Sequence, residues 1–444
     1  MDDSTIISSV RVTLLTILLA FWIYVYAQSR QKDESNKVFG EENGCQPIQK
    51  RLLFKWPLAL TSSNGNTMFY MGKTFQVKLL GKVGYFTTDP RNLEAILLTR
   101  FEDFELGSRR QGLFPMIGEG IFTQDGHPWK HSREILRRQF VRIQYQDLKV
   151  FESPINDLLD GLMSSSGIVD LQPFFFRFTL ATTTSLIFGE PFAGLDSTDH
   201  EIFSKNFDYC SLTSAMRLRL ADWCWIYSPW KFKKSCQMVK RYATHYVNHA
   251  PKDKDENGEE AASERHPFIL DLYKELQDPV VVHYLLVRHP VALERLRQEI
   301  RLYTQIPVNV RVASKTTFIP RGGGPDGLSP LLLTKGTGIG FSPYHMHRHK
   351  DLYGDDANEF RPERWEGPEL KSIGWGFMPF HGGPRICLGK DFALTEASYG
   401  IVRILQCFPC LHLPPGHSTE PSGLVKQDLT LVVSSAEGCK VMLS

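Results

Sequence analysis

The sequence has almost no excess of one charge, no regular cysteine spacing and no phosphate-binding motif. Its 51 Lys and Arg against 49 Asp and Glu leave a net charge of +2, so no polyanion such as nucleic acid is implied as the main partner. The eight cysteines form no disulfide framework, which suits a reducing compartment. The pair Cys407 and Cys410 has no second C-x-x-C with which to bind zinc. The glycine-rich run 321–327 lacks the Lys-Ser/Thr of a phosphate loop and predicts a turn between strands.

A long apolar segment, Ile6–Tyr26, lies near the start of the chain. At about 1.5 Å per residue, a helix of this length exceeds the roughly 27 Å core of an endoplasmic-reticulum bilayer. Acidic residues precede the segment and basic residues follow it, which puts the C-terminal bulk in the cytosol. A cleaved signal peptide is the alternative, but the basic start that it needs is missing. We expect an uncleaved, single-pass anchor in the endoplasmic-reticulum membrane at 1–30 and a polar linker at 31–65.

Residues 66–444 are predicted to form one large domain. Strand-like runs at 75–80 and 85–88 predict a hairpin, and a helix is expected after Asp89-Pro90. Further along we expect an apolar loop at 108–122, several helices over 140–250 and a charged flexible loop at 251–265. A set of tryptophans beside lysines predicts either contact with a membrane surface or simple helix packing. These residues are Trp223, Trp225, Trp230, Lys231, Lys233 and Lys234.

A ten-residue string near the C-terminus carries the strongest signal. Residues 380–389 read F-H-G-G-P-R-I-C-L-G and fit F-x-x-G-x-R-x-C-x-G, a chance match on the order of one in ten thousand for a chain of this size. The string resembles the haem-thiolate loop of the cytochrome P-450 family. The resemblance implies haem b as cofactor and Cys387 as the axial ligand of its iron, which cysteine binds as a thiolate. The alternative is a buried structural cysteine in a glycine turn.

Each residue of this loop has an expected role. The start of the helix that follows Cys387 attracts an anion, and Gly383 and Gly389 lack a Cβ, so the backbone can approach the sulfur. The resemblance implies that Phe380 is an apolar wall and that Arg385 binds a haem propionate. Four-residue spacing predicts a helix with an apolar face that packs under the haem, formed by Ala393, Ala397, Ile401 and Leu405.

Shorter segments resemble other parts of the same family. Trp129 and Arg133 form a W-x-x-x-R on one helical face, and Arg311 follows a segment similar to the end of the family's K helix. The resemblance implies that all three bind haem propionates. Residues 360–365 resemble the family's P-E-R-F segment, which locks the core before the cysteine loop. The structural residues implied by these matches are Arg301, Glu363 and Arg364.

The similarity covers roughly residues 65–283 and 284–444, and it is greatest to the fungal alkane and fatty-acid hydroxylase branch. It implies a mainly α fold with small β-sheets. It also implies a membrane-bound monooxygenase that hydroxylates a lipophilic, alkane-like or fatty-acid-like substrate with O₂. The electrons would come from NADPH through a reductase partner, and the thiolate favours O–O cleavage. In the family, the region 108–122 lines the substrate pocket.

Two central parts of the family pattern are missing. The I helix should carry A/G-G-x-D/E-T-T/S, but the string at 193–198 that matches it lies too early in the chain and outside a long apolar helix. Gln298 stands three residues before Arg301, where the family's E-x-x-R has Glu, and a buried Arg left unpaired costs about 3–5 kcal/mol. We therefore expect two internal deletions, near 281–284 and 298–301. No proton-delivery residue can be named.

Two other functions stay open on this evidence. One is a non-catalytic remnant that binds haem weakly or not at all. The other is a haem-thiolate isomerase or dehydratase, which needs no oxygen activation. Loss of the acid–alcohol pair alone permits the second function, whereas loss of the whole I helix argues against it.

Overall fold

The computed structural model describes residues 35–48, 51–53, 72–79, 82–143, 148–188, 197–257, 301–416 and 426–443. Within these ranges, no helix is both long enough and apolar enough to cross a bilayer. The anchor predicted at 1–30 and the seams predicted near 281–284 and 298–301 lie outside the described residues, apart from Arg301 itself. The segment predicted as a linker is described in part, with helical backbone over 35–42 and the strand β1, Arg51–Leu53.

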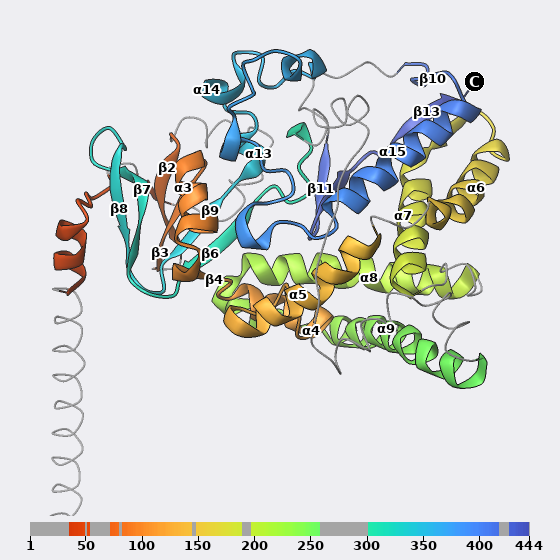
Figure 1. Cartoon of the computed structure of the whole chain (residues 1–444), viewed down its shortest axis with the longest axis horizontal. Coiled ribbons are helices and arrows are strands. Elements are labelled where there is room, and N and C mark those ends of the chain that lie inside the picture. The colour runs from red at the N-terminus through yellow and green to blue at the C-terminus, as the bar shows by residue number, and fades with distance from the viewer. Residues whose placement is uncertain are drawn as a thin grey trace, which may run out of the picture.

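One side of the molecule is built on a six-stranded sheet (Figure 1). Its strands after β1 are β2 (Thr74–Leu79), β3 (Lys82–Thr87), β4 (Phe104–Glu105), β6 (Asn309–Ala313) and β9 (Gly338–Phe341). Their order is β1-β2-β3-β9-β6-β4. The predicted hairpin is confirmed, because β2 and β3 pair antiparallel with Phe75 opposite Phe86. The antiparallel pairing of β6 with β9 places Arg311 opposite Ile339.

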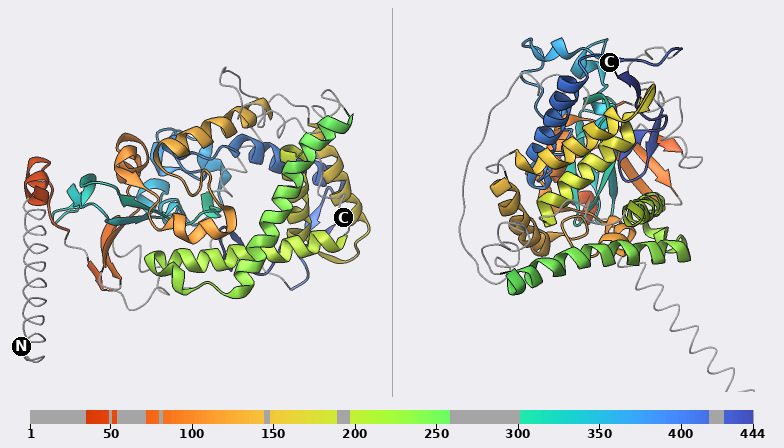
Figure 2. Two further views of the ribbon diagram at one scale, coloured as in Figure 1. Left: turned by 90° about the horizontal axis from the view of Figure 1, so that it is seen from below. Right: turned by 90° about the vertical axis from the view of Figure 1, so that its right-hand side faces the viewer.

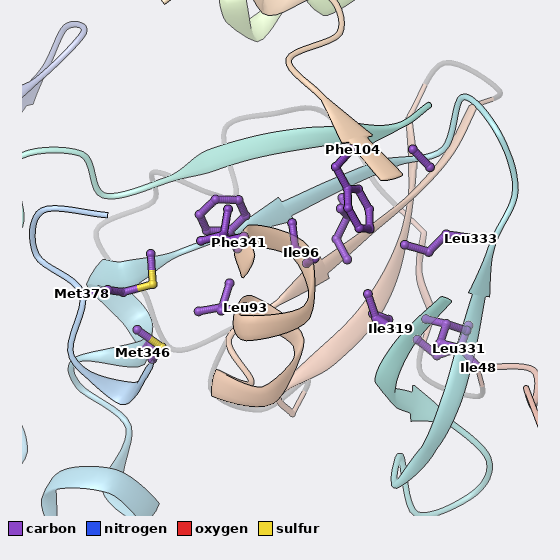
Figure 3. Packing of buried hydrophobic residues seen from close by; sticks show 13 residues of the cluster. Ile48, Leu93, Ile96, Phe104, Ile319, Leu331, Leu333, Phe341, Met346 and Met378 are labelled. Atoms are coloured by element: carbon purple, nitrogen blue, oxygen red, sulfur yellow. The ribbon is translucent and has the colours of Figure 1, made fainter. Parts of the chain in front are cut away.

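The helix predicted after Asp89 is confirmed as α3, Pro90–Glu94. The Asp89 carboxylate caps it by accepting from the Arg91 backbone N–H at 2.9 Å. This helix and the turn after it place Leu93 and Ile96 in a core against the sheet, with Phe341 from β9 (Figure 3). Leu93, Ile96 and Phe341 are fully buried, and each such side chain contributes about 1.5–3 kcal/mol to stability.

The described residues also form smaller sheets. The glycine-rich turn is confirmed as the connection between β7, Thr317–Gly323, and β8, Ser329–Leu333. The remaining strands are β5 (Ile168–Asp170), β10 (Leu411–His412), β11 (Gln427–Leu429), β12 (Val433–Ser435) and β13 (Lys440–Leu443).

Helices are the main elements in the rest of the described residues, so the predicted mainly α fold with small sheets is confirmed (Figure 1). The helices predicted over 140–250 are also present. The helices after α3 are α4 (Arg109–Ile117), α5 (Gly126–Ile143), α6 (Lys149–Met163), α7 (Leu171–Phe188), α8 (Ser197–Arg219), α9 (Trp230–Asn257), α13 (Pro343–Met346), α14 (Lys350–Tyr353) and α15 (Lys390–Cys407).

Two predicted loops are wrong where the structure describes them. Residues 109–117 form helix α4, because Leu113 and Met116 are buried on one face that packs against α8 and α9. Residues 251–257 continue helix α9. A helix that is already nucleated gains one hydrogen bond for each residue added, so a charged segment can extend it.

Candidate functional site

The Cys387 loop joins a short 3₁₀ turn, Gly383–Arg385, to helix α15. The backbone N–H of Cys387 donates to the Phe380 carbonyl at 3.0 Å, and this bond closes the loop. Gly383 has a φ of +63°, and a Cβ at this position would overlap the Leu97 carbonyl. The loop therefore requires glycine at 383. The group that approaches this glycine is the Leu97 backbone, whereas the prediction named the Cys387 sulfur.

The surroundings of the Cys387 sulfur act on its charge in both directions. The residue is exposed among the described residues, yet protein atoms near the sulfur desolvate it and raise the pKa of the thiol, and Asp391 raises it further. The Gly389 backbone N–H and the Arg133 guanidinium oppose this rise. The expected donor at the start of α15 is therefore present, but the protein groups alone leave the pKa raised. A coordinated metal cation deprotonates a thiol outright.

A cavity of about 350 Å³ lies beside Cys387. Its lining combines apolar side chains with two arginines and one carboxylate. The lining residues are Arg133, Arg137, Phe140, Gly383, Pro384, Ile386, Leu388 and Asp391. The sulfur therefore lies next to a space that suits a largely apolar group.

Helix α5 brings Trp129 and Arg133 to the cysteine loop. Trp129 is buried, and the Arg133 guanidinium lies 5.8 Å from its ring centre. Arg133 Nη2 donates to the Ile386 carbonyl, next to Cys387 in the chain, at 2.6 Å. Trp129 and Arg133 thus lie on one face of α5, as predicted. The hydrogen bond from Arg133 joins this helix to the cysteine loop.

Arg385 packs on the same tryptophan, 4.2 Å from the Trp129 ring centre. Its Nη2 forms an ion pair with Asp125 Oδ1 at 2.7 Å. Nη1 donates to the Ile121 carbonyl at 3.2 Å, and Nη2 also donates to the Gln124 carbonyl at 3.0 Å. Burial lowers the pKa of Arg385 to about 10, although Asp125 acts in the opposite direction.

Arg311 is buried on β6 and lies beside His381 of the cysteine loop. Its Nη1 donates to the Val310 carbonyl at 2.8 Å and to Asn309 Oδ1 at 3.1 Å. Its Nη2 lies 3.1 Å from His381 Nε2. Burial, together with Arg311, lowers the pKa of His381 to about 3, so the ring is neutral. Nε2 therefore accepts from Arg311, and Nδ1 donates to the Gly382 carbonyl at 3.1 Å.

Beside the cysteine loop, the described residues include more arginines than carboxylates. Arg109, Arg311 and Arg385 face one another, and Asp125 is the acidic group that opposes all three among the described residues. Burial and the nearby arginines lower the pKa of Arg311 to about 9. The Arg109 Nε is buried and has no hydrogen-bond partner in the described part of the chain. This basic cluster, Arg109, Arg311 and Arg385, therefore fits a group that carries carboxylates.

Three members of this arrangement were not predicted from the sequence. Arg109 lies in the segment predicted as a loop, and Asp125 and His381 belong to no residue pattern that singles them out. Asp125 is separated by 260 positions from its partner Arg385. Only the fold brings these side chains together, so no local signal could have found them.

Comparisons with known proteins identify the family. The sequence model described as cytochrome P-450 matches residues 63–279 and 300–433. The chain belongs to the cytochrome P-450 family. A protein from Arthroderma benhamiae named cytochrome P-450 is 36% identical over 508 aligned positions, which cover 96% of this chain and 97% of the relative. Cytochrome P-450 52A5 of Candida maltosa is 37% identical over 83% of this chain and 81% of its own length.

Cytochrome P-450 52A1 of Candida tropicalis is 36% identical over 84% of this chain and 80% of its own length. These relatives confirm the predicted fungal branch. Membership of the family makes the chain an oxidoreductase of the monooxygenase class, as the resemblance implied.

The remaining residues of this cytochrome P-450 loop differ from expectation in part. Phe380 is half-buried, and Gly389 has room for a Cβ, whose nearest neighbour would be Phe140 at 3.6 Å. The predicted apolar face of α15 includes Ile401 and Leu405, which are exposed among the described residues, and its packing under the haem stays a prediction. Helix α15 instead buries a neighbouring face against α6 and α7, formed by Leu394, Glu396, Gly400 and Ile404.

The structural arginines of this cytochrome P-450 are buried. Arg301 donates to the carbonyls of His347 and Ala357, both at 2.6 Å. Arg364 forms an ion pair with Asp356 at 3.1 Å. Glu363 has an exposed side chain, so the carboxylate that serves Arg364 is Asp356. The P-E-R-F segment is a 3₁₀ turn, Pro362–Trp365, and this turn directs Arg364 inward and Glu363 outward.

Proposed function

We propose that the chain binds haem b, with the Cys387 sulfur as axial ligand of the iron and the basic cluster on the propionates. The observation that carries this proposal is a buried group of arginines, opposed by one carboxylate, beside the cysteine loop. Membership of the cytochrome P-450 family supports it. When bound, a haem-thiolate supplies the activation of O₂ for insertion of oxygen into a C–H bond.

The side chains of the site would divide the work of holding this cofactor. Arg311 and Arg385 supply charge-assisted hydrogen bonds, which are stronger than neutral ones. Arg133 and Trp129 are further propionate candidates, and Trp129 also covers the Arg385 guanidinium. His381 and Asp125 would act through the arginines, because each fixes the orientation of one guanidinium.

We propose a lipophilic substrate, alkane-like or fatty-acid-like, and electrons delivered from NADPH by a reductase partner. The fungal 52 branch supports both parts. The segment 108–122, which lines the substrate pocket in the family, supports the substrate class, because its apolar side chains Phe114, Ile117 and Phe122 are exposed. The cationic Arg133 and Arg137 beside Cys387 suit an acidic partner surface.

We also propose attachment to the endoplasmic-reticulum membrane, with the haem domain in the cytosol. The predicted anchor at 1–30 is one support. A second is the turn between α8 and α9, where Trp223, Trp225 and Trp230 are 46%, 67% and 75% exposed, beside Lys231 and Lys233. Exposed tryptophans next to lysines suit the interface of a membrane with anionic lipids. With residues 1–30 removed, so that the anchor does not hold the protein on the membrane, flotation with anionic vesicles should fall in a Trp225→Ser/Trp230→Ser variant. It should stay unchanged in Phe176→Ser, which removes an aromatic side chain that is 57% exposed on α7.

The predicted loss of the I helix leads to a second candidate function, a remnant that does not activate oxygen. The family model leaves residues 280–299 unmatched. The alignment with the Arthroderma relative has 508 positions, more than the 444 residues of this chain, so that relative carries residues that this chain lacks. Both findings support deletions near 281–284 and 298–301. Sequencing of the transcript across the codons for 270–310 tests this proposal, because extra in-frame sequence with an acid–alcohol pair would make the chain an ordinary monooxygenase.

A reduced-carbon-monoxide difference spectrum of the purified full chain tests haem binding. We expect a Soret band at the thiolate position in the original protein and its loss in Cys387→Ser. The matched control is Cys407→Ser, an exposed cysteine at the other end of α15. Equal spectra for the original protein and Cys387→Ser, or no haem uptake by the original protein, would contradict the proposal.

A further inference from the structure

Helices α8 and α9 cross each other (Figure 2, left) and pack together. Each contributes a cysteine to their contact. Cys210 of α8 is 0% exposed and Cys236 of α9 is 4% exposed. The two sulfurs are 3.6 Å apart, and both side chains are free thiols.

This thiol pair sits in a small apolar cluster that includes Met116 of α4 and Phe232 of α9. A buried cysteine is often only a small apolar side chain. Cys224 is also buried, but the groups beside its sulfur are Arg217 Nη2 and the Gln111 amide oxygen, each at 3.9 Å. At Cys210 and Cys236, by contrast, two sulfurs on different helices already touch. A disulfide needs them to approach to about 2.05 Å, a change that side-chain rotation and a small helix shift can supply.

We propose that Cys210 and Cys236 are a redox-modification site, which closes into a disulfide between α8 and α9 when the chain meets a disulfide oxidant such as oxidised glutathione. One cysteine attacks oxidised glutathione as a thiolate, which forms a mixed disulfide and releases one reduced glutathione. The second cysteine attacks the protein sulfur of that mixed disulfide and releases the second reduced glutathione. The two thiols lose two electrons and two protons, and oxidised glutathione accepts both.

The environment of the pair makes this reaction depend on opening of the helices. Burial, together with the neighbouring Cys236, raises the pKa of Cys210 to about 12. The pKa of Cys236 is also raised by burial. Little thiolate is therefore present in the closed structure, and attack requires α8 and α9 to part. Once formed, the disulfide joins the two helices that cover α4. The disulfide should therefore slow the entry of substrate past α4. This effect on substrate rests on the proposed function, whereas formation of the disulfide does not.

The test incubates the full chain, as purified, with oxidised glutathione, blocks the free thiols with iodoacetamide and digests the protein with trypsin. We expect peptide 206–217 linked to peptide 235–240, with the link removed by dithiothreitol. Cys224→Ser should keep the linked peptide, and Cys236→Ser should lose it. The proposal is wrong if both peptides are recovered only in alkylated form under conditions that oxidise Cys407 and Cys410, or if the links scatter over other cysteine pairs.

Amide hydrogen exchange measures the restraint without any assay of activity. In the oxidised protein, the opening of α8 and α9 should slow by about tenfold or more, since openings that separate the two helices are blocked. Helix α6, which carries no cysteine, is the internal control and should not change. Unchanged exchange in α8 and α9 of the crosslinked protein would contradict the claim that the disulfide restrains these helices. This result does not depend on the activity of the enzyme toward any substrate.

Discussion

The Arg385 guanidinium is held by the Asp125 carboxylate at 2.7 Å, across 260 positions of the chain. The same carboxylate is the acidic group that opposes Arg109 and Arg311 among the described residues. The site therefore carries a positive excess before any cofactor binds. A ligand with two carboxylates would relieve that excess, which links the stability of this region to haem binding.

Removal of the Asp125 charge should destabilise the haem-free protein more than the haem-loaded protein. Asp125→Asn leaves Arg385, whose side chain is 9% exposed, without its ion pair. The usual cost of about 3–5 kcal/mol for breaking a buried pair is reduced here to about 1–3 kcal/mol, because Asp125 is itself 35% exposed. Urea unfolding with and without haem measures both values.

The control for Asp125 is Glu119→Gln. It breaks the ion pair with Arg110, in which both side chains are 49% exposed, so its effect should stay within about 0.5 kcal/mol. An equal loss of stability in the two variants, or an effect of Asp125→Asn that haem does not reduce, would contradict the role given to Asp125.

Arg311→Gln should weaken haem binding by about 10–100-fold, because a hydrogen bond to a charged group contributes about 1.5–3 kcal/mol. Arg311 is buried and faces His381, so its donors are already oriented. Transfer of haem to an acceptor protein measures the rate of loss. Arg110→Gln is the control, since this neighbour of Arg109 is exposed and pairs with Glu119 at the surface. Equal rates of haem loss in the two variants would remove Arg311 from the propionate site.

The parts of this site that the sequence predicts are the ones encoded by neighbouring residues. The cysteine loop is a ten-residue string, and the hairpin of β2 and β3 follows from alternating residues around glycine. Trp129 and Arg133 need only the helical repeat. In contrast, Asp125, Arg109 and His381 meet Arg385 and Arg311 through pairings 70 to 260 positions apart, and no local pattern reports such a contact.

The wrong prediction of a loop at 108–122 has the same cause. Helix α4 reads as a loop because Gly112 and Pro115 interrupt it, yet packing against α8 and α9 outweighs local propensity. On α15, the face of Gly400 and Ile404 packs against α6 and α7, whereas the face of Ile401 and Leu405, predicted to lie under the haem, stays exposed among the described residues. An apolar stripe on a helix does not say which neighbour covers it.

Glu396 should make stability depend on pH. Its carboxyl group is buried between α15 and α7, and the Thr182 hydroxyl donates to it. Burial raises the pKa of Glu396 to about 7, against the hydrogen bond from Thr182. The folded state then binds more protons than the unfolded state between about pH 4.5 and pH 7, so stability falls as pH rises through this range.

Glu396→Gln should remove this fall. The variant should match the original protein near pH 4.5 and exceed it at pH 8 by about 3 kcal/mol. Urea unfolding across the pH range measures the difference. Glu152→Gln, at an exposed position on α6, is the control and should leave the profile unchanged. A Glu396→Gln profile that still falls between pH 4.5 and pH 7 would assign the effect to another group.

Gly383→Ala and Gly389→Ala should behave differently, although both glycines belong to the same motif. At 383, φ is +63° and the new Cβ would overlap the Leu97 carbonyl, so the loop must move. We expect a loss of more than about 2 kcal/mol in stability and of the thiolate Soret band. At 389, φ is −84° and the new Cβ would touch only Phe140, at 3.6 Å or more. Stability should stay within about 1 kcal/mol of the original protein. A Gly389→Ala variant that keeps its stability but loses the thiolate band would mean that Gly389 serves the cofactor, and not the fold of the loop.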